Sequence, residues 1–318
     1  MGAYIIRRIL QAILTLTIVV ILVFLTVRLL PGDPLLMYIS SQNMQDVTEE
    51  QLADLRHQFG LDKSLAAQFI DWVGQALKGD LGVSIIGRTK VTEDIKTRMP
   101  KSIYIGFLGL LVSSSIGIPL GILAAIRRGT WMDNLITSFG NLGMTVPVFW
   151  LGVMLIYVLG LKLDLLPIFG YTSPFKDFGK SVLQLIMPIF CLAVPGIAGD
   201  IRITRSSMLE VMRQDYIRTA WSKGLKEFVI IFKHAIKNGF IPIITLKGMA
   251  FAGIFGGQVF VEQVFSIPGM GRLAVASVTA KDYPEIQGIM LVIGILVLTI
   301  NLIVDLSYGW LDPRVRYA

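Results

Sequence analysis

Few residues in this sequence have the type and spacing that catalysis or metal binding requires. The two histidines, His57 and His234, lie far apart in the chain, and we expect them on opposite sides of a membrane. A histidine metal site within the chain is therefore not predicted. Cys191 is the single cysteine, which excludes an internal disulfide and a cysteine metal cluster.

The carboxylates inside apolar stretches are too scattered for an active site. A membrane enzyme needs His, Asp, Glu or Ser clustered at mid-depth, and Asp200, Asp305 and Glu262 form no such cluster. Residues 179–181, Gly-Lys-Ser, end like a phosphate-binding loop, but Pro174 stands where the earlier glycine is required and no strand precedes it. We predict no catalytic residue, no metal site and no cofactor in this chain.

Two opposite charges within apolar stretches are predicted to hold helices together. A charge in hydrocarbon costs ~2.5–3.5 kcal/mol on insertion scales, so Asp200 and Lys247 each need a partner or water. We predict that they form a structural ion pair between two helices. The alternative is that each side chain reaches water at the inner membrane face separately.

Four residues are candidates to line a translocation pathway, because helices broken by glycine or proline line cavities in carriers. They are Asn141, Met144, Gln258 and Glu262. The alternative for Met144 is an ordinary contact with lipid or another helix. Asn301 and Asp305 share one helical face, and for them we favour hydrogen bonding between helices over a role in transport.

The composition of the 318 residues is that of an integral membrane protein. Hydrophobic residues make up 54% and charged residues 16% of the chain, against roughly 25% charged in a soluble domain. The mean hydropathy is +0.68. The net charge of +7 does not indicate nucleic-acid binding, because the basic clusters lie beside apolar spans rather than on a soluble face.

Hydropathy predicts six membrane-spanning helices, since about 20 apolar residues cross the hydrocarbon core. They cover residues 9–27, 102–126, 134 or 135 to 161, 184 to 201 or 203, 243–264 and 286–306. In the second span Gly117 and Gly121 flank Pro119, and this spacing lets another helix approach closely. Gly143 and Pro147 interrupt the third span.

The basic residues set the predicted orientation. Inner segments hold fourteen Lys/Arg and the two short outer loops hold five, so both termini are predicted to be cytoplasmic. The predicted domains are a first transmembrane helix (1–30), an extracytoplasmic segment (31–101) and a five-helix core (102–318). In the outer segment Thr48 and Gln51 predict an N-cap box for a helix over 49–59 that ends at Gly60.

Residues 202–242 form a basic interruption between the fourth and fifth spans. They hold eight Lys/Arg against three acids, which predicts a cytoplasmic loop. Apolar residues recur at helical spacing before Gly224, and again after it until Gly239 and Pro242, so we predict two short amphipathic helices hinged at Gly224. Such a pair suits a soluble partner, and the alternative is a loop lying on anionic lipid.

The whole chain resembles the permease subunits of binding-protein-dependent ABC importers, in the dipeptide, oligopeptide and nickel branch (the DppB and OppB type). The resemblance rests on the order and spacing of several short motifs. These are PGDP at 31–34, the stretch 52–73, GDLGVS at 79–84, PVFWLG at 147–152, and the stretches 205–225, 234–245, 261–273, 282–288 and 301–316. It implies an all-α, six-helix type I importer permease fold.

The resemblance also implies a role for the basic loop. In such importers a short cytoplasmic coupling helix, in the so-called EAA loop, sits in a groove of the ATPase. The matching positions begin at Arg218, Thr219 and Ala220, where Arg218 and Thr219 replace the glutamate and first alanine of the general pattern. The full set expected to couple to the ATPase is Arg218, Thr219, Ala220, Lys223, Gly224, Leu225, Lys226 and Glu227.

The implied function is half of the pathway of an ATP-driven importer for di- or oligopeptides in the cytoplasmic (inner) membrane. The implied partners are a second, similar permease, two ATPase subunits that bind ATP and Mg²⁺, and an extracytoplasmic binding protein, with lipid around the spans. Nickel or another small solute is the alternative within the branch. An ion-coupled secondary transporter is the alternative of another class, although no inverted repeat is visible.

Overall fold

The computed structural model describes residues 2–29, 35, 39, 48–58, 60–254 and 258–311. Within these ranges the chain is helical, and its extended structure is limited to an isolated bridge between Val83 and Lys90. The predictions for the turn at 31–34, for Phe59 and for the tail at 312–318 lie outside the described residues. The chain divides into two units, Met1–Lys101 with Pro268–Ala318, and Ser102–Ile267.

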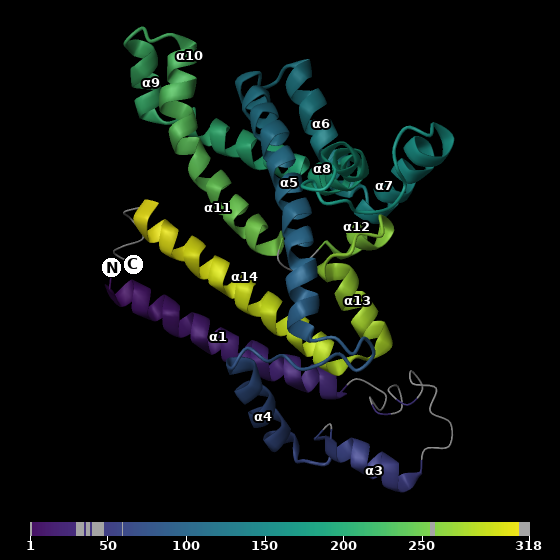
Figure 1. Cartoon of the computed structure of the whole chain (residues 1–318). Coiled ribbons are helices and arrows are strands. Elements are labelled where there is room, and N and C mark those ends of the chain that lie inside the picture. Colours follow the sequence, from purple (N-terminus) through teal and green to yellow (C-terminus); the bar gives the residue numbers. More distant parts are fainter. Residues whose placement is uncertain are drawn as a thin grey trace. The chain divides into compact units, whose positions relative to one another are not determined.

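The first unit is built on helices α1 (Gly2–Leu29) and α14 (Tyr283–Leu311), which lie side by side in opposite directions (Figure 1). Helices α3 (Glu49–Gln58), α4 (Leu65–Leu77) and α13 (Met270–Ala280) complete it, together with the start of α5 (Val91–Ile126). Helix α4 packs its Phe69 and Trp72 rings against Phe24 of α1. Arg8 and Asp305 join α1 to α14 with an ion pair at 3.1 Å.

A buried carboxylate fixes the loop that precedes α5. Asp282 accepts hydrogen bonds from the Ser84 hydroxyl (2.5 Å) and from the backbone N–H groups of Ile85 (3.1 Å) and Ile86 (3.0 Å). Asp282 is 2% exposed, so these donors supply the polar contacts that a buried charge needs. Two motifs that are almost 200 residues apart, GDLGVS and DYPEIQG, are thereby joined.

The second unit contains the rest of α5 and the elements that follow it (Figure 1). They are α6 (Trp131–Thr145), α7 (Val148–Leu155), the π-helical turn η1 (Ile156–Lys162), α8 (Phe178–Val211), α9 (Asp215–Ser222), α10 (Glu227–Val229), the π-helical turn η2 (Ile230–Ala235), α11 (Ile236–Ile254) and α12 (Val259–Val264).

The glycines of the second predicted span have the predicted role. A Cβ on Gly117 would lie 2.6 Å from the Cβ of Asp200, and one on Gly121 would lie 2.6 Å from that of Thr204. Contacts this short are not tolerated, so only glycine permits the approach of α5 to α8. The helix that approaches is thus identified as α8, and the prediction from the Gly-x-x-x-Gly spacing is confirmed.

Among the described residues, four helices are individually long and apolar enough to cross a membrane, and the number rises to six if each of two bent pairs counts as one span. The four are Ile5–Leu29, Val91–Ile126, Phe178–Val211 and Tyr283–Asp305. The pairs are Trp131–Thr145 with Val148–Lys162, bent by 97°, and Glu227–Phe240 with Pro242–Ile254, bent by 43°. The all-α integral membrane class is confirmed. Pro147 ends α6 as predicted, because the residue before a proline is driven out of the helical region.

Several predicted boundaries were wrong because hydropathy marks apolar stretches and not helix ends. Helix α5 begins at Val91 instead of residue 102, and α8 continues to Val211, so residues 202–211 are helix and not loop. Helix α11 runs through Gly239 and Pro242, where the Gly239 carbonyl also accepts a hydrogen bond from Ser207 (2.8 Å). The predicted outer loop 266–285 contains α13, and the predicted span 243–264 holds parts of two helices, α11 and α12.

Candidate functional site

Residues 215–235, here called the tip, form a compact end of the second unit made of α9, α10 and η2 (Figure 1). The tip packs around an apolar core that it shares with α5 and α8. Ile217 and Ala220 of α9 are 0% and 6% exposed and pack with Met208 of α8 and with Ile230 and Ile231 of η2. This packing holds α9 against the helices on either side of it and makes the tip a folded element rather than a loose loop.

Gly224 makes the turn at the centre of the tip. Its φ is +73°, in the left-handed region that favours glycine, and its N–H donates to the carbonyl of Trp221 (2.9 Å). A Cβ at Gly224 would meet nothing within 4 Å, so the requirement for glycine is conformational and not steric. The predicted hinge at this residue is confirmed. The first predicted helix is in fact two, because α8 ends at Val211 and α9 begins at Asp215.

The eight residues expected to couple to an ATPase lie on α9, in the Gly224 turn and at the start of α10. Seven of them are exposed: Arg218, Thr219, Lys223, Gly224, Leu225, Lys226 and Glu227. Ala220 is the exception, because it is buried in the apolar core of the tip. Arg218 lies 3.7 Å from Asp215, and both side chains are largely exposed, so this pair adds little stability.

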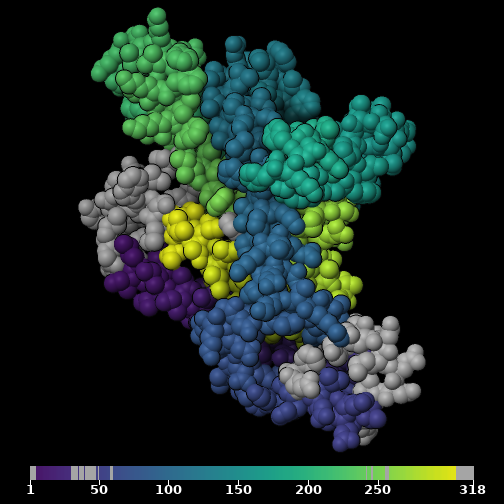
Figure 2. Space-filling view, viewed as in Figure 1, coloured from purple at the N-terminus to yellow at the C-terminus, as the bar shows by residue number. Residues whose placement is uncertain are grey.

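The tip surface also carries exposed aromatic side chains, which the sequence analysis did not predict as part of a site. Tyr216, Trp221, Phe228 and Phe232 are 42%, 45%, 68% and 55% exposed. The rings of Phe228 and Phe232 lie 4.3 Å apart between centroids, as expected for residues one helical turn apart. Figure 2 shows the green atoms of α9 and α10 as a lobe at the upper left. Exposed aromatics beside basic residues are typical of protein interfaces.

An ion pair with a buried carboxylate ties α8 to α6, six residues before α8 ends at Val211. Asp133 accepts hydrogen bonds from Arg205 at Nε (2.7 Å) and at Nη2 (2.8 Å), and a third from the backbone N–H of Gly129 (3.0 Å). The Asp133 side chain is 4% exposed. Sequence reasoning counted Arg205 as a loop residue and passed over Asp133, although Asp133 is the single acid between residues 102 and 163.

The second unit also contains an open, largely apolar cavity of about 310 Å³ between α5, α8 and α11, with a few polar residues in its lining. Lys247 donates to Asp200 (2.5 Å) and to the Ser113 hydroxyl (3.2 Å), and all three residues line the cavity. The structure therefore brings together the two charges that were predicted to pair. Gln258, one of the four pathway candidates, lines the same cavity.

The other pathway candidates lie elsewhere in the unit. Glu262 is fully buried and accepts hydrogen bonds from the Ser102 hydroxyl (2.6 Å) and from the backbone N–H of Gln258 (3.3 Å). These contacts join α12 to α5. Asn141 and Met144 are exposed on α6 and do not line this cavity. The four candidates thus do not form one site within the described part of the chain.

Comparison with known families covers both halves of the chain. Residues 117–317 match the model of the binding-protein-dependent transport system inner membrane component, and residues 1–105 match the model of the N-terminal part of such membrane components. The chain belongs to this family. It is thus a transport subunit, an integral membrane component of an ABC import system that works with an ATPase and a substrate-binding protein.

Relatives align along the whole chain. It is 40% identical to the probable peptide ABC transporter permease protein y4tP of Sinorhizobium fredii over 317 residues, which cover 100% of both chains. It is 38% identical to the oligopeptide transport system permease protein AppB of Bacillus subtilis, again over 100% of both. Identity to the dipeptide transport system permease protein DppB of Escherichia coli is 32%, over 99% of this chain and 98% of that protein.

A solved structure supports the fold. The MetNI methionine ABC transporter in an inward-facing conformation superposes with a TM-score of 0.54 at 15% identity, covering 69% of this chain and 96% of that chain. At this identity the similarity shows a shared importer permease fold and nothing about the solute.

Proposed function

We propose that this permease forms one half of the pathway of an ATP-driven peptide importer and that its tip is the surface on which an ATPase subunit acts. The relatives named above are described as peptide, oligopeptide and dipeptide permeases, which supports peptides as the solute class. The observation that carries the coupling role is the construction of the tip, whose surface is basic and aromatic and whose apolar core is shared with α5 and α8.

The proposed mechanism requires a stiff connection between the tip and the membrane helices. When two ATPase subunits bind ATP and close, each would move the tip seated on it, and the attached helices would change from inward-facing to outward-facing. Helix α8 runs without interruption from the cavity to the tip, and the Asp133–Arg205 pair anchors its end to α6. Displacement of the tip would therefore reach the cavity instead of being absorbed by a flexible loop.

The partners and the orientation follow from the same proposal. A second, homologous permease would complete the pathway, a binding protein would deliver the peptide from outside, and ATP and Mg²⁺ would bind to the ATPase subunits. The tip and both termini would be cytoplasmic, in agreement with the excess of basic residues in these segments. Gln258, Asp200 and Lys247 would form a polar wall of the pathway, because their cavity lies where α5, α8 and α11 meet.

Uptake by the reconstituted importer tests the coupling role. Gly224→Val forces a β-branched residue into the left-handed region, at a cost of about 1–2 kcal/mol, and is expected to distort the turn. ATP-driven uptake of a labelled di- or tripeptide by proteoliposomes that contain the whole complex should fall severalfold, together with ATPase retention. Gly74→Ala, on α4, is the matched control, because a Cβ there meets nothing within 4 Å, no left-handed φ is required, and the residue lies outside the tip and the cavity.

A second measurement checks the orientation separately. A cysteine placed at exposed Lys223 should react with a membrane-impermeant maleimide in inside-out vesicles and not in intact cells, whereas native Cys191 is buried. Labelling from outside would overturn the cytoplasmic position of the tip. Unchanged peptide uptake and ATPase retention in the Gly224 variant would overturn the coupling role.

A further inference from the structure

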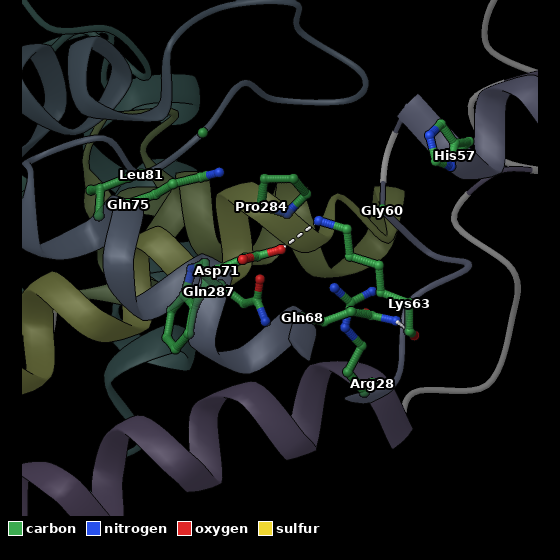
Figure 3. A pocket seen from close by; sticks show the side chains of 12 residues that line it. Arg28, His57, Gly60, Lys63, Gln68, Asp71, Gln75, Leu81, Pro284 and Gln287 are labelled. Atoms are coloured by element: carbon green, nitrogen blue, oxygen red, sulfur yellow. Dashed lines mark hydrogen bonds and ion pairs between the residues drawn. The ribbon is translucent and has the colours of Figure 1, made fainter. Parts of the chain in front are cut away.

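The first unit contains a polar cavity of about 270 Å³ between the end of α1, helix α4 and the start of α14 (Figure 3). Arg28 enters it from α1, Gln68 and Trp72 from α4, and Gln287 from α14. Figure 3 shows the side chains of Arg28, Gln68 and Gln287 directed toward one another. The volume is at the lower limit of ligand sites, so the cavity suits a small group and not a peptide.

Among the buried side-chain atoms of this cavity that lack a hydrogen-bond partner in the described part of the chain, donors outnumber acceptors. Three buried donor atoms have no partner among the residues that the structure describes: Arg28 Nε, Trp72 Nε1 and Gln287 Nε2. One acceptor, Gln68 Oε1, is in the same condition. Gln287 is only 4% exposed, so its amide is not satisfied by bulk solvent. Buried donors in folded proteins normally have partners, which indicates that an acceptor binds here.

The charge balance gives the sign of that acceptor. Lys63 donates to Asp71 at 2.6 Å, and this hydrogen bond raises the pKa of Lys63 and keeps the amine protonated. His57 is held at 2.7 Å by Asp62. The Arg28 guanidinium stands over the Phe24 ring at 5.4 Å, and no carboxylate pairs with it in the described part of the chain. The cavity therefore has an excess of one fixed positive charge.

We propose that this cavity binds the phosphate oxyanion of a phospholipid headgroup or of inorganic phosphate. Phosphate offers several acceptor oxygens and negative charge, and the planar fork of Arg28 matches its geometry. Arg28 lies in the last turn of the candidate span Ile5–Leu29, at the level where lipid headgroups meet a transmembrane helix. Leu22, Leu25 and Leu29 on the same helix are exposed and could contact acyl chains. The proposal does not depend on the solute that the importer carries.

Lipid binding to the intact importer tests the site. The complex is purified, stripped of lipid and titrated with phosphatidylglycerol or with a galactosyl diacylglycerol that has the same acyl chains, and native mass spectrometry counts the bound lipid. Equilibrium dialysis with radiolabelled inorganic phosphate, in phosphate-free detergent, tests the free anion. Arg28→Met and Gln287→Leu each remove a donor and retain most of the volume. Arg7→Met, at an exposed position on the other end of α1, is the matched control.

The wild-type complex should retain phosphatidylglycerol in preference to the galactolipid. Arg28→Met should weaken phosphate binding at least tenfold, and Gln287→Leu should weaken it less. Arg7→Met should leave phosphate binding unchanged. Retention of the lipid without binding of inorganic phosphate identifies a headgroup site. Binding of inorganic phosphate without lipid preference identifies a free-anion site. If the wild-type complex shows neither preference, or if both variants bind as wild type does, the proposal is overturned. Gln287→Leu keeps the Arg28 charge and serves if the arginine variant does not assemble.

Discussion

The tip and the C-terminal half of α8 use charged residues in opposite ways. At the tip the charges are outside, on Arg218, Lys223 and Lys226, and the apolar residues are inside. Two charges of α8 instead face other helices, where Asp200 pairs with Lys247 and Arg205 pairs with Asp133. The two regions follow one another in the chain, since α8 ends at Val211 and the tip begins at Asp215. The tip nevertheless has a surface suited to a water-soluble partner, whereas the α8 region has an interior suited to the membrane.

Exposed charges and buried charges serve different functions here: the first suit binding to a partner, and the second hold helices in place. An exposed ion pair is weakly stabilising and can exchange partners, which suits a surface that binds another protein. A buried pair is costly to break, because the remaining charge loses both its partner and its hydration. We infer that the α8 pairs fix the position of the tip, whereas the tip's own charges and aromatic rings contribute to the contact with the ATPase.

The largest expected effect comes from removing the anchor of α8. Asp133→Asn leaves Arg205 without its carboxylate and should lower the free energy of unfolding by about 3 kcal/mol, the lower end of the range for buried pairs, because Arg205 remains 29% exposed. The midpoint of thermal unfolding in detergent measures the loss. Asp215→Asn, the same substitution at a 97% exposed tip residue, is the control and should change stability by less than ~0.5 kcal/mol. Equal effects of the two variants would remove the distinction between the regions.

Substitutions on the aromatic surface of the tip should affect ATPase binding and leave the stability of the permease unchanged. Phe228→Ala leaves the tip core intact, since Phe228 is 68% exposed, but should weaken ATPase binding by about 2 kcal/mol, or roughly thirtyfold, if the ring is an interface anchor. Retention of the ATPase on the immobilised permease measures this loss. Phe175→Ala, at a fully exposed phenylalanine outside the tip, is the matched control. Unchanged ATPase retention in the Phe228 variant would contradict an interface at this surface.

The Asp200–Lys247 pair gives a smaller, reciprocal effect. Each single charge reversal should reduce the yield of folded protein, and the double variant Asp200→Lys with Lys247→Asp should recover about 1–2 kcal/mol as the coupling energy between the two residues. The coupling energy is measured with a double-mutant cycle, from the thermal unfolding of wild type, the two single variants and the double variant. If the stability losses of the single variants simply add in the double variant, each residue acts alone and the two do not form a structural ion pair.

The features that could be predicted from the sequence are those set by a large free-energy cost at one residue or by a local pattern. A charge in hydrocarbon is expensive, so Asp200 and Lys247 could be expected to pair before their separation was known. Gly224 could be identified because two helical periods stop and restart around it, and its φ of +73° explains why glycine is needed. Thr48 and Gln51 form the predicted reciprocal cap of α3, with backbone-to-side-chain distances of 3.1 and 3.4 Å.

Features that depend on distant partners could not be predicted. Asp133 and Arg205 are 72 residues apart, and Arg205 looked like one of several loop cations. The tip aromatics were assigned to apolar helical periods, but a helix with apolar residues on two faces does not reveal which face is buried. Phe232 is exposed whereas its neighbour Ile231 is buried, and this outcome is decided by the packing of Ile231 against α8 and α9.

The smallest expected effect concerns the exposed charges of the tip. Lys223→Ala and Lys226→Ala remove cations that lack buried contacts, so each should change the free energy of unfolding by less than ~0.5 kcal/mol. Their contribution to ATPase association should instead depend on ionic strength, since exposed charges are screened over about 8 Å at physiological salt. Association rates measured at low and at high salt should differ less for the double variant than for wild type. An equal salt dependence would mean that these cations do not face the partner, and the contact would then rest on the aromatic surface alone.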